Sequence, residues 1–286
     1  RWFVTGAVPL RDEHGGVVSW FGSTTDIHQQ KEMEQALRHA DRRKDEFLAT
    51  LSHELRNPLA PMGYALDLLH EAGNDAPTIE RARTMMERQL IHLVRLVDDL
   101  LDISRVTAGK LQLERGAVAL STIVDSAVES SQPQIEAGGQ HLEVELPLEP
   151  LVVDGDTTRL SQVLTNLLNN AARYTPRGGS IRLAAERRGD EVALWVRDTG
   201  IGLAPGQAER IFDLFVQGRE AAQSQRGLGV GLALARALVE LHGGRIAASS
   251  DGPGLGAEIL VHLPLLATGS VIEAAARAAA PLASPP

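Results

Sequence analysis

The sequence predicts an α+β protein in two main parts, a long helical hairpin followed by a two-layer α/β sandwich. Two observations support this expectation. Between residues 47 and 108, apolar side chains recur every three or four positions in two runs that a short polar break separates. Beyond residue 109, runs typical of strands alternate with runs typical of helices over about 150 residues, a usual domain size.

Residues 1–27 predict a pair of strands before the hairpin. Residues 12–16 are typical of a turn, and residues 17–21 form a β-rich run. Two strands alone are marginal in water, so we expect the tail of a larger domain. The sequence also begins with Arg1 rather than Met, and we expect a piece of a longer protein.

Two helices are predicted next. Asp26 is a suitable N-cap for the first, which opens with good helix formers, and Thr78 can cap the second after a Gly- and Pro-containing break at residues 73–77. Each helix carries one narrow apolar stripe, formed by Phe47, Leu51, Leu55, Leu59, Met62, Leu66 and Leu69 in the first and by Ile79, Met86, Leu90, Leu93, Val97, Leu100 and Ile103 in the second. A single hairpin cannot cover both stripes, whereas two hairpins can as a four-helix bundle. We therefore expect a homodimer.

Residues 113–266 predict the α/β sandwich. Its expected helices span residues 121–131, 156–174 and 232–242, and its expected strands span residues 141–146, 151–153, 181–186, 192–198, 245–249 and 257–263. Residues 267–286 are rich in Ala and Pro and predict a linker.

The composition excludes several classes of site. A net charge of −9 argues against a dominant nucleic-acid surface, and the absence of Cys excludes disulfides and thiolate metal sites and fits a reducing compartment. No apolar run approaches the length needed to cross a bilayer, and no signal peptide is visible. We expect a cytoplasmic fragment without membrane contact of its own, which is compatible with an anchor elsewhere in the full-length protein.

The stretch LSHELRNPL places His53, Glu54 and Asn57 on the first helix beside Pro58, a residue that costs a helix interior about 3 kcal/mol. Its spacing is close to the zinc motif H-E-x-x-H, but Asn57 stands at the last position, and Asn is a poor zinc ligand. His53 and Asn57 are one turn apart and share a face. On this geometry alone a solvated polar face is favoured. The functional alternative is an exposed, nucleophilic imidazole held by a neighbouring carboxylate.

A second motif lies on the predicted helix over residues 156–174. Asn166, Asn170 and Arg173 line one stripe of that helix. Amide oxygens can bind Mg²⁺, and an Arg can neutralise phosphate. The alternative is an ordinary polar surface.

Two glycine-containing motifs follow. Asp198 ends a strand before Gly200 and Gly202, where its carboxylate can accept a hydrogen bond from an amino group such as that of adenine. Glycines at 227, 229 and 231 precede a helix whose first N–H groups can hold phosphate, although the Gly-Lys of a Walker A loop is absent. The alternatives are a plain turn and a flexible loop. In their order along the chain, however, the motifs together indicate a magnesium-nucleotide site preceded by a helical His.

In this order the motifs closely resemble those of the sensor histidine kinases of two-component signalling. Residues 47–59 resemble the phosphoacceptor box, 166–174 the N box, 198–202 the first glycine box, 212–215 the F box and 227–231 the second glycine box. The resemblance covers about residues 30–265. Residues 2–27 resemble, over a shorter stretch, the C-terminal strands of a PAS sensor domain.

The resemblance implies the domain order. A PAS remnant would span residues 1–27, a signalling helix 28–46, the dimerisation and histidine phosphotransfer hairpin 47–108, an ATP-binding catalytic domain of the Bergerat or GHKL type 113–266, and a linker 267–286. A hybrid kinase, in which a receiver domain follows the linker, is one continuation compatible with this order.

The resemblance also implies the chemistry. His53 would take the γ-phosphate of ATP, Glu54 would act as general base, and Asn57 would orient the phosphate or an attacking water. The implied ATP site comprises Asn166, Asn170, Arg173, Tyr174, Asp198, Gly200, Gly202, Gly227, Gly229 and Gly231, with Asn170 as the Mg²⁺ ligand. The phosphoryl group would then pass to an Asp of a response-regulator receiver domain.

Arg173, Leu214 and Leu228 depart from the residues usual in this family, but none removes a group that the chemistry needs. Two other functions remain open. One is a catalytically silent scaffold that binds ATP or a partner through the same fold. The other is a different ATPase sharing the nucleotide fold, of the chaperone or mismatch-repair type, although that class lacks the His-bearing hairpin.

Overall fold

The computed structural model describes residues 1–73, 75–214 and 229–266, without the side chains of residues 39, 40, 43, 44, 46 and 47. The chain divides into two compact units, Arg1–Arg56 and Asn57–Pro286, and each is described by itself. Several predicted features lie outside the described residues, namely Gly227, Leu228, the F-box Phe215 and the tail from residue 267.

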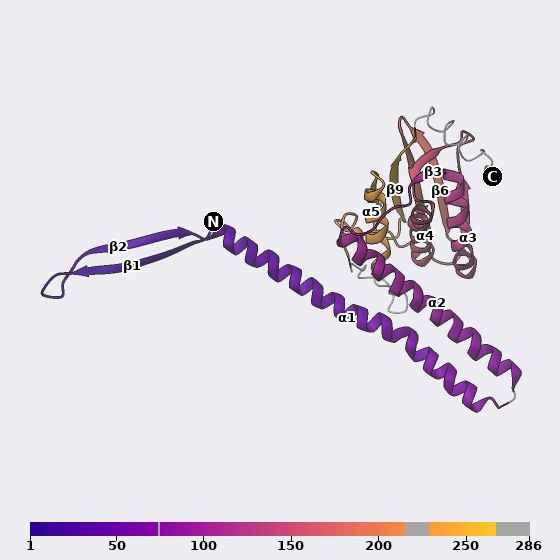
Figure 1. Ribbon diagram of the computed structural model, residues 1–286, viewed down its shortest axis with the longest axis horizontal. Helices are drawn as coiled ribbons and strands as arrows, with labels where there is room; N and C mark the ends of the chain where they lie inside the picture. The colour runs from indigo at the N-terminus through magenta and orange to yellow at the C-terminus, as the bar shows by residue number, and fades with distance from the viewer. Residues whose placement is uncertain (74, 215–228, 267–286) are drawn as a thin grey trace, which may run out of the picture. The chain divides into compact units, whose positions relative to one another are not determined.

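The first unit confirms the expected strands. Strands β1 (Phe3–Arg11) and β2 (Val17–Asp26) form an antiparallel hairpin, and helix α1 (His28–Glu71) begins shortly afterwards (Figure 1). The Asp26 carboxylate accepts the His28 N–H at 2.9 Å, so it satisfies one of the free backbone N–H groups at the start of α1. That these strands belong to a PAS domain stays a prediction.

Helix α1 continues through Pro58 and Pro61 without a break, and the boundary between the two units falls between Arg56 and Asn57. The predicted start of the second helix was wrong by three residues, because the N-cap is Asp75 and not Thr78. Helix α2 (Ala76–Thr107) has Asp75 as its N-cap and a Pro in its first turn, where the missing N–H is harmless. Thr78 donates its hydroxyl to the Asp75 carboxylate instead of capping the helix itself.

Within the second unit, α2 returns antiparallel to the end of α1 after a short connection (Figure 1). Ala65 on α1 and Ala82 on α2 are fully buried, as expected where two helices approach closely. Many larger apolar side chains of the predicted stripes remain exposed in the single chain, among them Leu59, Leu66, Ile79, Leu90 and Val97. The hairpin therefore leaves much of its apolar surface uncovered.

The rest of the second unit is the expected α/β sandwich. Its elements are β3 (Gly116–Ala119), α3 (Leu120–Gly138), β4 (His141–Glu145), β5 (Val152–Gly155), α4 (Thr157–Tyr174), β6 (Ser180–Arg188), β7 (Glu191–Asp198), the 3-10 turn η1 (Arg210–Phe212), α5 (Gly231–Leu241), β8 (Arg245–Ser249) and β9 (Ala257–Pro264). The main sheet has the order β4-β6-β7-β9-β8, in which only β4 and β6 are parallel neighbours. Strand β5 pairs with β3 in a separate two-stranded sheet.

The core lies between the helices and one face of the main sheet. Helix α4 packs between α3 and α5, and all three cover the same layer (Figure 1). Alternate residues of the strands point into this core, as a period of two requires; in β7 these are Val192, Leu194 and Val196. This packing fixes α4, the end of β7 and the start of α5 relative to one another.

Two sequence-based expectations for this domain were wrong. Helix α3 does not end at Ser131 but continues through Pro133 to a left-handed Gly139 with φ of 61°. Burial of Ile135, which is 1% exposed, favours the longer helix. Strand β3 was missed because four small residues carry no recognisable alternation. In the described part of the chain, no helix combines the length and apolarity that a membrane span needs.

Candidate functional site

Helix α4 carries the predicted amide stripe. Its opposite face is apolar and buried, and its N-terminus is capped by the Asp156 carboxylate, which accepts the Arg159 N–H at 3.1 Å. Asn166, Asn170 and Arg173 are all half-buried. A helix anchored by one apolar face therefore presents two amides and a guanidinium at one edge of the core.

The start of α5 lies beside that stripe. The Asn166 side-chain N–H donates to the carbonyl of Gly231, the first residue of α5, at 3.3 Å. A Cβ added at Gly231 would lie 3.6 Å from the Asn166 amide carbon, an ordinary contact distance, so Gly231 and Asn166 are direct neighbours. Gly229, just before it, has φ of 66°, a left-handed conformation that favours glycine. The structure thus joins two predicted motifs, an amide stripe and a helix N-terminus suited to anions.

The turn after β7 lies against the C-terminal end of α4. The Asp198 carboxylate accepts the Gly200 N–H at 2.8 Å, and the Tyr174 carbonyl accepts the Ile201 N–H at 3.2 Å. A Cβ at Gly200 would lie 2.4 Å from the Tyr174 carbonyl oxygen, so only glycine fits without a backbone shift. Asp198, Gly200 and Tyr174 are therefore brought together as the sequence predicted.

Burial raises the pKa of the Asp198 carboxyl above its ordinary value, while hydrogen bonds from the backbone N–H groups of Gly200 and Ala257 oppose this rise. A half-buried carboxylate held by backbone donors is a fixed acceptor. Such an acceptor can select a ligand that offers an amino group.

Sequence reasoning missed the loop that supports this turn. Residues 250–256 connect β8 to β9 and carry glycines at 252, 254 and 256. A Cβ at Gly202 would lie 2.1 Å from the Gly252 carbonyl oxygen, and one at Gly256 would lie 2.0 Å from the Asp198 carbonyl oxygen. The alternating glycines before a strand were the available signal, because close backbone approach requires them.

The predicted phosphoacceptor motif divides between the two units. His53 is exposed, whereas the neighbouring Glu54 is 6% exposed. Consecutive helical residues leave the helix about 100° apart, which accounts for this difference. Asn57, the first residue of the second unit, is exposed and precedes a buried Pro58.

A further contact joins α2 to α4 within the second unit. The Asp102 carboxylate accepts Arg159 Nη1 at 2.5 Å and Gln162 Nε2 at 3.1 Å. One turn earlier, burial raises the pKa of the Asp99 carboxyl to about 6. Sequence reasoning did not foresee this contact, because it depends on the packing of two helices far apart along the chain.

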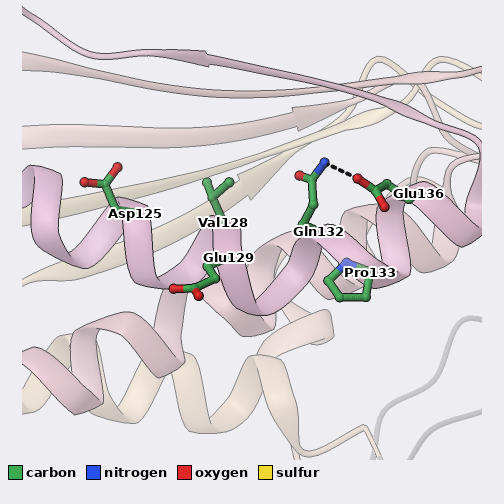
Figure 2. Close-up of a pocket in the computed structure, with 6 residues that line it drawn as sticks. All are labelled: Asp125, Val128, Glu129, Gln132, Pro133 and Glu136. Atoms are coloured by element: carbon green, nitrogen blue, oxygen red, sulfur yellow. Dashed lines mark hydrogen bonds between the residues drawn. The ribbon is translucent and has the colours of Figure 1, made fainter.

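A pocket on the surface of α3 is not the nucleotide site. Its described lining residues all come from that helix, and three of them are carboxylates, Asp125, Glu129 and Glu136 (Figure 2). The Gln132 amide donates to Glu136 at 2.8 Å (Figure 2). None of the predicted site residues lines it, and its negative charge disfavours phosphate.

The fold and the motifs of the second domain are those of a known family of nucleotide-binding domains. A model of the "Histidine kinase-, DNA gyrase B-, and HSP90-like ATPase" family matches residues 155–267, and a model of the "His Kinase A (phospho-acceptor) domain" matches residues 43–109. With both domains in this order, the chain belongs to the sensor histidine kinases.

Individual proteins support this assignment. The chain is 37% identical over 261 residues to the sensor protein DivL of Caulobacter vibrioides, an alignment that covers 90% of the chain and 33% of DivL. It is 35% identical over 252 residues to the histidine protein kinase DivJ of the same organism, covering 85% of the chain and 41% of DivJ. The chain thus spans well under half the length of these relatives.

Solved structures share the fold. Full-length ShkA in complex with AMPPNP is 31% identical with a TM-score of 0.57, over 77% of this chain and 46% of ShkA. Histidine kinase ThkA in complex with the response regulator protein TrrA gives a TM-score of 0.58 at 22% identity, over 93% of this chain and 76% of that chain. The second likeness concerns the fold alone.

Proposed function

We propose that this chain phosphorylates His53 with ATP and passes the phosphoryl group to an aspartate of a response regulator. The observation that carries the proposal is the convergence of three motifs, the α4 amide stripe, the α5 N-terminus and the Asp198 turn, through Asn166–Gly231 and Tyr174–Ile201 hydrogen bonds. They lie in a chain that also has a phosphoacceptor domain. ATP is available in the cytoplasm, which is the compartment we propose.

In the proposed reaction, a ring nitrogen of His53 attacks the γ-phosphorus, and the bond from that phosphorus to the β–γ bridging oxygen breaks. ADP leaves, and the proton on the other ring nitrogen passes to Glu54 as general base. Asn57 orients the phosphate or, in a phosphatase reaction, the attacking water. Phosphoryl transfer needs mainly positioning and charge neutralisation. The exposed imidazole of His53 suits this role, because the nucleophile must reach ATP bound at a separate site.

At the nucleotide end, Asp198 accepts a hydrogen bond from the adenine amino group. Arg173 binds the phosphates and Tyr174 contributes to the same site. Gly200 and Gly202 allow close backbone approach, and Gly229 and Gly231 lie at the N-terminal end of α5 with its first N–H groups. Asn170, with Asn166 nearby, supplies an amide oxygen for Mg²⁺. Half-buried neutral amides fit that ion, because Mg²⁺ would take its remaining ligands from water and phosphate and would neutralise charge on the phosphates.

The homodimer is part of the same proposal. Leu59, Leu66, Leu90 and Val97 are each more than two-fifths exposed in the single chain. A second hairpin would cover them and complete a four-helix bundle, whereas exposed apolar stripes of this length are unfavourable in water. Light scattering at micromolar concentration should give twice the mass of the chain, and a monomer would contradict this part.

Incubation with γ-labelled ATP and Mg²⁺ tests the reaction. The proposal predicts an acid-labile, base-stable label that disappears in His53→Ala. Bound ATP without any label would indicate the silent scaffold. Sustained release of free phosphate without phosphohistidine would indicate an ATPase of the chaperone or mismatch-repair type.

A further inference from the structure

The hydroxyl of Ser250 links the two loops that form the Asp198 turn. It lies 2.6 Å from the Gly256 carbonyl oxygen and accepts the N–H groups of Leu203 at 3.0 Å and Gly252 at 3.2 Å. A hydroxyl has one proton to donate and two lone pairs to accept with. The Gly252 carbonyl, at 3.2 Å, is the more distant acceptor, so donation to Gly256 saturates the group.

This bond reaches Asp198 through a single peptide unit. The Gly256 carbonyl and the Ala257 N–H belong to the same planar peptide group. Ala257 is the first residue of β9, lies opposite Asp198 in the sheet, and its N–H is a hydrogen-bond donor to the Asp198 carboxylate. The Ser250 hydroxyl therefore holds one end of a peptide plane whose other end holds the carboxylate. Hydrogen bonds arranged in such a chain strengthen one another.

Backbone hydrogen bonds also join these two loops. The Gly254 N–H donates to the Ile201 carbonyl at 2.6 Å, and the Gly256 N–H donates to the Gly200 carbonyl at 3.0 Å. The two loops are therefore in direct backbone contact on both sides of the hydroxyl. Through Leu203 and Gly256, Ser250 connects the turn after Asp198 to the loop before β9.

We propose that Ser250 is a positioning residue for nucleobase selection, because its hydroxyl orients the peptide that holds the Asp198 carboxylate. The inference rests on the proposed function, in which Asp198 accepts the adenine amino group. Guanine offers a carbonyl at the corresponding ring position, which a carboxylate repels. Loss of the Ser250 hydroxyl therefore reduces the preference for ATP over GTP. Among the described residues, those of α4 and α5 make no hydrogen bond to Ser250, so we expect phosphate binding to be unaffected.

The test measures dissociation constants of ATP and GTP by calorimetry for the wild-type chain, Ser250→Ala, Ser250→Thr and Ser249→Ala. Ser249 is the matched control, because it is exposed and neighbours Ser250. Removing a hydrogen bond to a half-buried acceptor is expected to weaken ATP binding about tenfold in Ser250→Ala and GTP binding less than about twofold. Ser250→Thr, which keeps the hydroxyl, should restore most of the preference, and Ser249→Ala should not change it.

Measuring ATP binding over a range of pH adds a second test, because a general loosening of the loop would not change the pH at which binding is lost. The Ala257 N–H opposes the rise in the Asp198 pKa, so freeing it raises that pKa further. ATP binding of Ser250→Ala should then fail at a higher pH on the acidic side than wild-type binding. If Ser250→Ala does not fold, Ser250→Cys, which keeps the size but donates weakly, carries the same comparison.

The outcomes separate this inference from the proposed function. A folded wild-type chain that binds neither nucleotide would overturn both. The role of Ser250 alone would be overturned if the wild-type chain prefers ATP and Ser250→Ala keeps the same preference. It would also be overturned if Ser250→Ala weakens the binding of ATP and GTP equally.

Discussion

Replacing His242 by Phe should destabilise the ATP-binding domain by about 2–4 kcal/mol. This side chain is 1% exposed and follows the end of α5. Its Nδ1 donates to the Leu238 carbonyl at 2.7 Å, and its Nε2 accepts the Asp156 N–H at 3.0 Å. Asp156 is the N-cap of α4, so the imidazole connects α5 to the helix that carries the amide stripe.

The magnitude follows from the two bonds. Phe removes both, and loss of the bond to the Leu238 carbonyl costs about 1 kcal/mol. The Leu238 carbonyl keeps a partner, because it also accepts the His242 N–H at 3.2 Å. The Asp156 N–H, in contrast, is left buried and unpaired, which costs about 1–3 kcal/mol more.

Urea unfolding followed by Trp195 fluorescence measures this change. Trp2 and Trp20, the other two tryptophans, are exposed and are first replaced by Phe so that the signal reports on the ATP-binding domain. His242→Gln is the matched control. Its side-chain oxygen can reach about the position of Nε2 and accept the Asp156 N–H, so it should lose no more than about half as much stability. Equal stability of His242→Phe and wild type would refute the reasoning.

Three further expectations follow from the same structure. The free energy of unfolding should depend on pH through His242, because burial lowers the pKa of the folded-state imidazole below its ordinary value of 6.5. The stabilisation by neutral His242 is complete above pH 6.5 and is lost as the pH falls toward the folded pKa. Wild type should therefore lose unfolding free energy as the pH falls from neutral to acidic, whereas His242→Gln should not show this loss. Asp102→Asn should lower the free energy of unfolding by about 2 kcal/mol, because the Arg159 guanidinium on α4, which is only 22% exposed, loses its anion. Asp98→Asn, at an exposed position, is the control and should not change stability; equal effects of the two substitutions would refute the α2–α4 contact. Gly200→Ala should weaken ATP binding at least about tenfold in a filter assay, because the new Cβ would lie 2.4 Å from the Tyr174 carbonyl oxygen at the end of α4. Gly116→Ala is the control and should bind ATP normally, because a Cβ at that position meets no atom within 4 Å.

Much of the ATP-binding domain could be predicted from local pattern. Helix α4 has a strong apolar face, an Asp cap and a polar stripe, so both its extent and its candidate site residues were predictable. The Asp198 turn was predictable for the same reason, since a clear strand alternation ends where Asp and Gly begin. These are places where local preference and tertiary packing agree.

Other features depend on contacts between distant segments. The sequence around Ser131 and Pro133 favours an early helix end, but burial of Ile135 in the core extends α3. The loop over residues 250–256 supports the Asp198 turn through backbone contacts, and no side-chain pattern announces such contacts. Likewise, LSHELRNPL alone favours a solvated face. His53 acquires its proposed role only from the nucleotide motifs more than 100 residues further along the chain.

The most direct test of the central claim is the position of the phosphoryl group after incubation with ATP and Mg²⁺. Peptide mapping by mass spectrometry at alkaline pH, where phosphohistidine survives, can distinguish His53 from the other eight of the nine histidines in the chain. The account predicts phosphate on His53, none in His53→Ala, and normal labelling in the control His70→Ala, an exposed histidine at the end of the same helix. Phosphate on another residue, or labelling that persists in His53→Ala, would contradict it.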